Sequence, residues 1–362
     1  MTARPTTERP PPIPLTVLTG FLGAGKTTLL NRLLSDPALA DTVVIVNEFG
    51  EIGLDHLLVE TAEDGMILLS AGCLCCTVRG DLVDTLEDLL RRRDNGRIAP
   101  FRRVVVETTG LADPAPILGA VLHHPYLSMR YAIGSVVTVV DAVHGLLTLD
   151  AHGEAARQAA VADRIVLTKA DLVSDAPTVD ALRGRLRDLN PGAVLGDAAD
   201  ASLAALLLDG FFDPGKTADV RAWLRAEAVE AGHGHHRHDV NRHDARIRAF
   251  CLTHDRSIPR ASLDLFLDLL RSAHGSRILR LKGLVALAED PERPVVIHGV
   301  QHVVHVPAVL PAWPDDDRRS RIVLIGQDLD RRFVERLWDA FLGRPGVDQP
   351  DRAALTDNPL AF

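Results

Sequence analysis

The sequence predicts an α/β fold, a doubly wound and mostly parallel sheet, followed by a smaller α+β domain. Two observations lead to this fold class. Between residues 15 and 222, short apolar β-branched runs alternate with stretches of helical periodicity, which is typical of a parallel sheet with helices on both faces. From residue 246 onward, several strands follow one another with helices at either end, which indicates an antiparallel sheet.

The alternation can be followed along the chain. In the first part, we expect strands at 15–19, 42–46, 103–106, 133–140, 164–167 and 193–195, with helices at 29–34, 81–93, 114–122, 154–162 and 179–189. Apolar runs at 57–60 and 66–69 flank Asp64-Gly65, which favours a hairpin there. In the second part, we expect strands at 247–252, 277–287, 294–297, 302–306 and 321–325, with helices at 263–272 and 331–341.

The bulk composition excludes several classes of protein. A net charge of −9 and a pI of about 5.9 argue against a nucleic-acid partner. Because no run of about 18 apolar residues exists, we expect no membrane-spanning segment. Residues 1–14 carry five prolines and no signal-peptide core, which predicts a flexible tail. Three of the four cysteines crowd residues 73–76, a spacing that suits a thiol site in a reducing compartment, so we expect a cytoplasmic protein.

Residues 20–28 carry the strongest motif in the chain. They read Gly-Phe-Leu-Gly-Ala-Gly-Lys-Thr-Thr and fit the Walker A pattern, between an apolar strand and a helix. Glycine-rich backbone at a helix N-terminus presents N–H groups to phosphates. We therefore expect nucleotide binding by Gly20, Gly23, Ala24, Gly25, Lys26, Thr27 and Thr28. Lys26 would neutralise the β- and γ-phosphates, and the Thr27 hydroxyl would bind Mg²⁺.

A Walker B-type element follows about 80 residues later, in the order that P-loop proteins use. The apolar run 104–106 ends at Glu107, and Gly110 comes three residues on. The Glu107 carboxylate would reach Mg²⁺ directly or through water, and the Gly110 amide would meet the γ-phosphate. Acidic residues at strand ends are common, so the spacing after the Walker A motif is what favours this function.

The stretch Thr168-Lys169-Ala170-Asp171 resembles the guanine-specificity motif Asn-Lys-x-Asp. Asp171 would accept hydrogen bonds from guanine N1 and its exocyclic amine, which adenine does not match. Thr168 stands where the motif has Asn, and the alternative for Asp171 is a helix N-cap. The sequence favours GTP over ATP.

The stretch Asn47-Glu48-Phe49-Gly50-Glu51 is predicted to be a switch loop that passes the γ-phosphate. Glu48 would bind Mg²⁺, position water or help bind a second metal; the alternative is a solvated loop carboxylate. Together with Lys26 and Glu107, Glu48 completes the set of candidate catalytic residues.

Three thiols at Cys73, Cys75 and Cys76 indicate a site for a borderline or soft cation such as Zn²⁺. Neighbouring side chains of an extended segment point apart, so we do not assume that all three bind one ion at once. Zinc normally takes four ligands, and a water, Glu48 or His124 would complete the set. The alternative is a group of buried structural cysteines.

A histidine-rich stretch separates the two predicted domains and holds five of the 15 histidines. Imidazoles there would collect Zn²⁺, Ni²⁺ or Co²⁺ weakly; the alternative is a solvated linker. The candidate accessory ligands are His233, His235, His236 and His238. The resulting predicted organisation is a tail (1–14), a GTPase domain (15–222), a helix end with linker (223–245), an α+β domain (246–345) and a second tail (346–362).

Taken together, the motifs resemble the CobW family of P-loop GTPases over most of the chain. The resemblance is carried by residues 20–28, 47–51, 107–114 and 168–172, by the stretch Gly-Cys-Leu-Cys-Cys-Thr at 72–77, by the histidine-rich linker and by Leu281-Lys282-Gly283. It implies a P-loop NTPase fold with a CobW C-terminal-like domain. It also implies a slow, partner-activated GTPase and metallochaperone that delivers zinc, cobalt or iron to a client metalloprotein, and it leaves room for a nucleotide-dependent dimer.

Zinc is favoured because the stretch from Ile52 to Ala71 is short for the cobalamin-type members of this family. Three other functions remain open. One is a zinc store or sensor in which GTP turnover is incidental, and another is a cobalt or iron insertase for a cofactor pathway or a metalloenzyme. The third, a redox switch using the vicinal thiols, is disfavoured because no thioredoxin-like βαβ context surrounds them.

Overall fold

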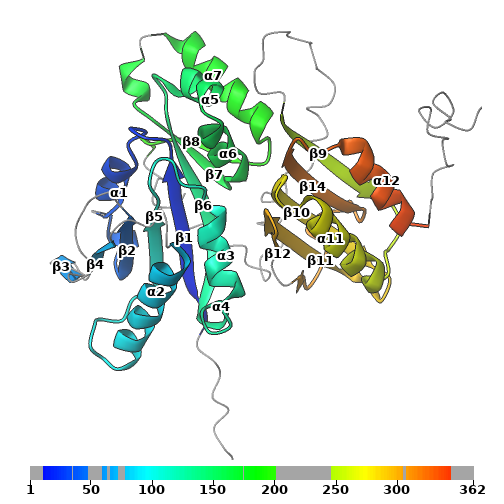
Figure 1. Cartoon of the computed structure of the whole chain (residues 1–362), viewed down its shortest axis with the longest axis horizontal. Helices are drawn as coiled ribbons and strands as arrows, with labels where there is room; N and C mark the ends of the chain where they lie inside the picture. Colours follow the sequence, from blue (N-terminus) through cyan, green and yellow to red (C-terminus); the bar gives the residue numbers. More distant parts are fainter. Residues whose placement is uncertain are drawn as a thin grey trace, which may run out of the picture.

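Two sheets organise the chain, one in each half (Figure 1). The computed structural model describes residues 11–34, 36–47, 59–62, 66–71, 78–173, 175–200, 246–304 and 307–343. Within these ranges, no helix is long and apolar enough to cross a membrane.

The N-terminal sheet is the predicted doubly wound, mostly parallel one. Its described strands run in the order β3-β4-β2-β5-β1-β6-β7-β8, and every neighbouring pair is parallel except β3 and β4. The antiparallel β3–β4 pair confirms the predicted hairpin. The strand bounds are β1 (Ile13–Gly20), β2 (Thr42–Asn47), β3 (Val59–Ala62), β4 (Met66–Ala71), β5 (Arg103–Glu107), β6 (Tyr131–Asp141), β7 (Arg164–Thr168) and β8 (Val194–Asp197).

Helices cover both faces of this sheet because its strands are apolar on both sides. Leu29, Leu30 and Leu33 of α1 (Lys26–Leu34) pack on one face, against Val44, Val105 and Val139. The opposite face is covered by α2 (Val78–Asp94), α3 (Ala115–His123), α6 (Gly153–Val161) and α7 (Ala176–Leu189). The short elements η1 (Pro37–Leu39), α4 (Leu127–Arg130), α5 (Gly145–Ala151) and η2 (Ala170–Leu172) were not predicted, because each is too short for a periodic pattern.

The C-terminal half is the predicted antiparallel sheet with two helices. Its described strands run in the order β12-β11-β10-β14-β9, with β13 beside β11. Helices α11 and α12 pack on one face, where Phe250, Phe266 and Trp338 share a core. The bounds are β9 (Ile247–His254), α11 (Arg260–His274), β10 (Ile278–Leu287), β11 (Asp290–Val300), β12 (Val303–Val304), β13 (Ala308–Val309), β14 (Ser320–Gln327) and α12 (Arg331–Phe341).

The other face of the C-terminal sheet packs on the N-terminal half. Helix α6 contacts β10, α7 contacts β9 and α3 contacts β12. Four buried apolar side chains of the C-terminal sheet belong to the same core as the helices of the N-terminal half: Ile247, Leu279, Val300 and Ile325. One continuous apolar core therefore spans both sheets.

A buried ion cluster lies in the same interface. Asp163, just before β7, accepts hydrogen bonds from Arg280 Nη2 at 2.5 Å and from the backbone N–H of Val136 at 3.0 Å. Lys282 Nζ lies 3.0 Å from the same carboxylate. Burial by itself raises the pKa of Asp163, but the two cations outweigh it and lower the pKa to about 2. One carboxylate of the N-terminal half, Asp163, therefore pairs with two cations of β10, Arg280 and Lys282.

Candidate nucleotide and metal site

The Walker A residues form a tight turn between β1 and α1. Gly20 has φ of +146°, and a Cβ there would lie 2.3 Å from the carbonyl oxygen of Val139. Gly25 has φ of +88°, a conformation that side chains of L-residues disfavour. Both positions therefore require glycine, and the turn delivers the exposed Thr27 and Thr28 to the first turn of α1.

The predicted phosphate-binding lysine is held within this turn. The Lys26 ammonium donates to the carbonyl oxygens of Gly20 at 2.9 Å and Phe21 at 3.2 Å. Burial lowers the pKa of Lys26, and the Glu107 carboxylate opposes this by raising it. Because these carbonyls are weak partners for a buried cation, an anion at the turn would compete well for the ammonium.

The predicted magnesium ligands lie side by side, although 80 residues separate them in the sequence. The Thr27 hydroxyl donates to Glu107 Oε1 at 2.8 Å. Glu107 is 4 % exposed at the carboxyl end of β5, which pairs with β1. The loop that follows β5 runs against the Walker A turn, since a Cβ at Gly110 would lie 2.6 Å from the Leu22 nitrogen. The structure thus joins the two motifs at one edge of the sheet.

The predicted base-recognition loop lies against the same turn. The Thr168 hydroxyl donates to the carbonyl oxygen of Ala24 at 2.6 Å, and Lys169 Nζ donates to that of Gly23 at 2.8 Å. Thr168 therefore ties this loop to the Walker A turn, although the usual motif has asparagine there. Asp171 is exposed in η2 and does not cap α7, whose N-cap is Asp175. This removes the helix-capping alternative for Asp171.

Asp141 was not predicted as a site residue from the sequence, yet its carboxylate holds the Lys169 side chain in place. Its Oδ2 accepts from Lys169 Nζ at 2.7 Å, and its Oδ1 accepts from the backbone N–H of Val143 at 2.7 Å. Burial raises the pKa of Asp141, but these hydrogen bonds outweigh it and leave the pKa below its usual value. The signal was present in the sequence, because Asp141 ends an apolar strand as Glu107 does.

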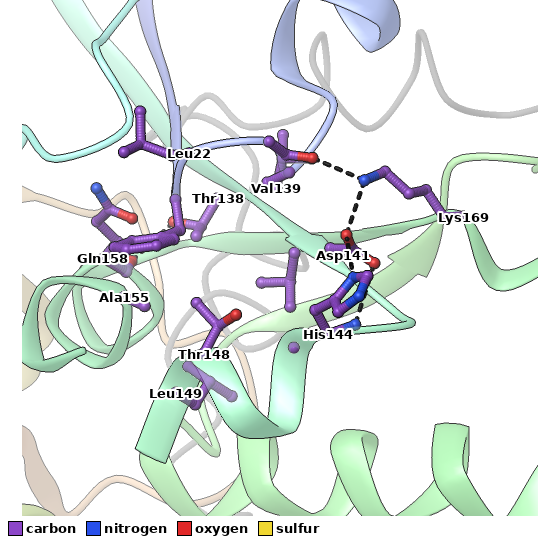
Figure 2. A pocket seen from close by; sticks show the side chains of 15 residues that line it. Leu22, Thr138, Val139, Asp141, His144, Thr148, Leu149, Ala155, Gln158 and Lys169 are labelled. Atoms are coloured by element: carbon purple, nitrogen blue, oxygen red, sulfur yellow. Dashed lines mark hydrogen bonds and ion pairs between the residues drawn. The ribbon is translucent and has the colours of Figure 1, made fainter. Parts of the chain in front are cut away.

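A pocket of about 240 Å³ lies between the Walker A turn, the end of β6 and helices α5 and α6. Figure 2 shows Asp141, His144 and Lys169 at one end of it and Gln158 at the other. Thr148 and Leu149 line the side formed by α5 (Figure 2). Lys169 thus lines this pocket and also contacts the Walker A turn through Gly23.

The other predicted metal ligands fall largely outside the described residues. This applies to Glu48, to Cys73, Cys75 and Cys76, and to His233, His235, His236 and His238. The strand ends that lead to them are described. Asn47 at the end of β2 pairs with Ala71 at the end of β4, and Val46 pairs with Glu107. The described ends of β2 and β4 therefore lie on the carboxyl edge that holds Glu107, with β2 directly beside β5 and β4 one strand further out.

His124 lies away from this edge. It follows the last residue of α3, which runs back from the carboxyl edge of the sheet. Its Nδ1 accepts from the backbone N–H of Leu127 at 3.3 Å, and its Nε2 lies 3.5 Å from the Glu87 carboxylate of α2. A nine-residue helix spans about 13 Å, so His124 is far from the end of β4 at Ala71.

The sheet order and the joined motifs define a P-loop GTPase. A family model described as "CobW/HypB/UreG, nucleotide-binding domain" matches residues 14–195, and one described as "Cobalamin synthesis protein cobW C-terminal domain" matches residues 247–342. The chain belongs to the CobW/HypB/UreG family, with a CobW-type C-terminal domain. This confirms the family predicted from the motifs, its fold and its GTPase activity.

Relatives of this chain match it over nearly its whole length. The zinc chaperone YjiA of Escherichia coli is 32% identical, over 92% of this chain and 98% of its own. The zinc-regulated GTPase metalloprotein activator 1 of Saccharomyces cerevisiae is 28% identical, over 90% and 82%. The crystal structure of Zn(II)-bound YjiA GTPase superposes with a TM-score of 0.71 at 29% identity, covering 91% of this chain and 99% of that one.

Proposed function

We propose that this GTPase is a metallochaperone that binds zinc at its cysteine segment and transfers it to a client metalloprotein under nucleotide control. One observation carries the proposal. The strands that precede the switch loop and the cysteine segment end at the same carboxyl edge as Glu107: Val46 of β2 pairs with Glu107, and Asn47 of β2 pairs with Ala71 of β4, one strand further out. Metal and γ-phosphate would then lie at one edge of the sheet, and the names of the relatives as zinc chaperones support the choice of metal.

The described residues fit GTP with Mg²⁺. Thr27 and Glu107 offer a hydroxyl and a buried carboxylate 2.8 Å apart, which are oxygen ligands that Mg²⁺ prefers. Lys26 would leave its carbonyl partners for the β- and γ-phosphates, and the Gly110 amide would meet the γ-phosphate. Asp171 would accept from guanine while Asp141 holds Lys169 in place beside it.

For the metal, we propose ligands from Cys73, Cys75 and Cys76, with Glu48 as a further ligand or as the residue that positions water. Thiolates suit zinc, and GTP would order the switch loop next to them. His124 is left out because it lies at the other end of α3. The histidines of the linker would act as weak accessory ligands.

Two alternatives share the same residues. A zinc store or sensor would bind metal with an affinity that does not depend on the nucleotide. A cobalt or iron insertase would show the same coupling with a different preferred metal. The experiment must therefore vary nucleotide and metal separately.

The test is a competition titration of zinc against a chromophoric chelator, with GDP or a non-hydrolysable GTP analogue bound. Linkage is reciprocal, and a coupling of about 1–3 kcal/mol would change zinc affinity roughly 5- to 150-fold between the two states. Affinity should also rise with pH because thiols bind as thiolates. Repeating the titration with Co²⁺ and Fe²⁺ identifies the preferred metal.

The control replaces Cys73, Cys75 and Cys76 by serine, with Cys251→Ser as the matched variant in β9. The triple variant should lose the tight site, and Cys251→Ser should keep it. Equal zinc affinity in both nucleotide states would refute the chaperone cycle and favour the storage function. An unchanged tight site in the triple variant would move the metal elsewhere.

A further inference from the structure

The loop after Glu107 is held from the side of α6. Gln158 Nε2 donates to the carbonyl oxygens of Gly110 at 3.2 Å and Ala112 at 3.0 Å. Both partners are acceptors, so the orientation of the Gln158 amide is fixed. Gln158 is 1 % exposed, which makes these hydrogen bonds costly to break.

The C-terminal domain holds the same loop from another side. Gln301 Nε2 donates to Asp113 Oδ2 at 2.6 Å. Asp113 Oδ1 accepts from the backbone N–H of Ala115 at 2.9 Å, in the first turn of α3. One carboxylate therefore connects the start of α3 to the turn between β11 and β12.

Gln301 lies in a turn that packs against α3. Gln301 has φ of +52°, which is unfavourable for a residue with a long side chain. On the same turn, His302 stacks on His123 of α3 with ring centroids 6.2 Å apart. A Cβ at Gly119 of α3 would lie 3.3 Å from Val303. The turn thus lies along α3, and these contacts hold Gln301 in the unfavourable conformation that places its amide at Asp113.

We infer that Gln301 is a positioning residue for GTP hydrolysis, supplied by the C-terminal domain. Through Asp113 it holds the loop that begins at Gly110, so that the Gly110 amide is in place before the γ-phosphate departs. Fixed donors stabilise a transition state better than donors that must be ordered during the reaction. The inference rests on the proposed role of Gly110. Loss of the contact should lower kcat and leave the KM for GTP unchanged, because the contact proposed for this loop is with the γ-phosphate alone.

The test variant is Gln301→Gly, which accepts the positive φ while removing the amide. Because this pair is only half-buried and acts on Gly110 through Asp113, we expect kcat to fall about 3- to 10-fold, which corresponds to about 0.6–1.4 kcal/mol of activation free energy. Gln301→Lys should restore most of the rate, because its ammonium also donates to Asp113. GTP turnover is measured on zinc-free protein, so failure of the metallochaperone proposal would leave this result unaffected.

Asp328→Gly is the matched control. Asp328 also has φ of +52°, and its carboxylate pairs with Arg246 within the C-terminal domain. This variant should keep the wild-type kcat. The inference is refuted if Gln301→Gly keeps the wild-type kcat, if Gln301→Lys turns over no faster than Gln301→Gly, or if Gln301→Gly raises KM and lowers the melting temperature well below that of Asp328→Gly. The last outcome would mean a purely structural role.

Discussion

The buried carboxylate Asp163 gives the sharpest stability prediction. Replacing it by asparagine keeps the shape and an oxygen for the Val136 N–H, but leaves Arg280 and Lys282 without their anion. In the folded wild-type protein, the pKa of Asp163 is lowered from its ordinary value of 3.8 to about 2. A tenfold change in proton affinity is about 1.4 kcal/mol, so the charged form of Asp163 contributes about 2 kcal/mol to the free energy of unfolding. Because Arg280 and Lys282 would become unpaired buried cations, we expect Asp163→Asn to lower the free energy of unfolding by about 2–5 kcal/mol.

The assay is urea unfolding followed by circular dichroism at pH 7, with Asp94→Asn as the control. Asp94 pairs with Arg130 at 2.8 Å, but its side chain is 44% exposed, so we expect a loss below about 1 kcal/mol there. The pKa of Asp163 is lowered by folding, so its contribution is complete above about pH 4 and fades as pH falls towards about 2. The difference between wild type and Asp163→Asn should shrink in that window. Equal effects of the two substitutions at pH 7 would refute the reasoning.

Three further predictions concern the ligand sites. Lys26→Ala should abolish tight GTP binding, measured by calorimetry, with the circular dichroism spectrum unchanged; wild-type affinity would contradict the Walker A assignment. Asp171→Asn should weaken GTP by about 1–3 kcal/mol and favour xanthosine triphosphate, measured by competition, because the amide donates where guanine N1–H also donates. If ATP competes equally with GTP in the wild type, the base assignment is wrong. Deleting residues 232–243 should lower the number of weakly bound zinc ions, measured by metal analysis after dialysis; loss of the tightest site would make the histidine tract primary.

The order of elements could be predicted because the strands are short, apolar and β-branched. Periodicity located β5 and β7 to within a residue. It did not extend β11 back to Asp290, because residues 291–293 of that strand are exposed. It also placed a strand at 302–306, where the described ladder is limited to β12, since Gln301 turns the chain there.

The nucleotide site was predictable where one contiguous motif carries it, as at Lys26 and Thr27. Contacts between segments that lie far apart in the sequence were not predictable. Asp141 and Gln158 act through hydrogen bonds to backbone carbonyls or to another side chain, and no local pattern reveals such partners. The same is true of Asp163, because its two cationic partners, Arg280 and Lys282, lie more than 100 residues away along the chain.

The shared core has a consequence for dissecting the protein. Ile247, Leu279, Val300 and Ile325 are each at most 6 % exposed, although a linker in the sequence marks a boundary just before them. A polypeptide ending at residue 245 would present the bare flanks of α3, α6 and α7 to water, together with the unneutralised charge of Asp163. Such a fragment should be prone to aggregation even though it retains every nucleotide-binding motif. Biochemical studies that separate the halves would then measure the cost of exposing this surface rather than the intrinsic properties of the GTPase.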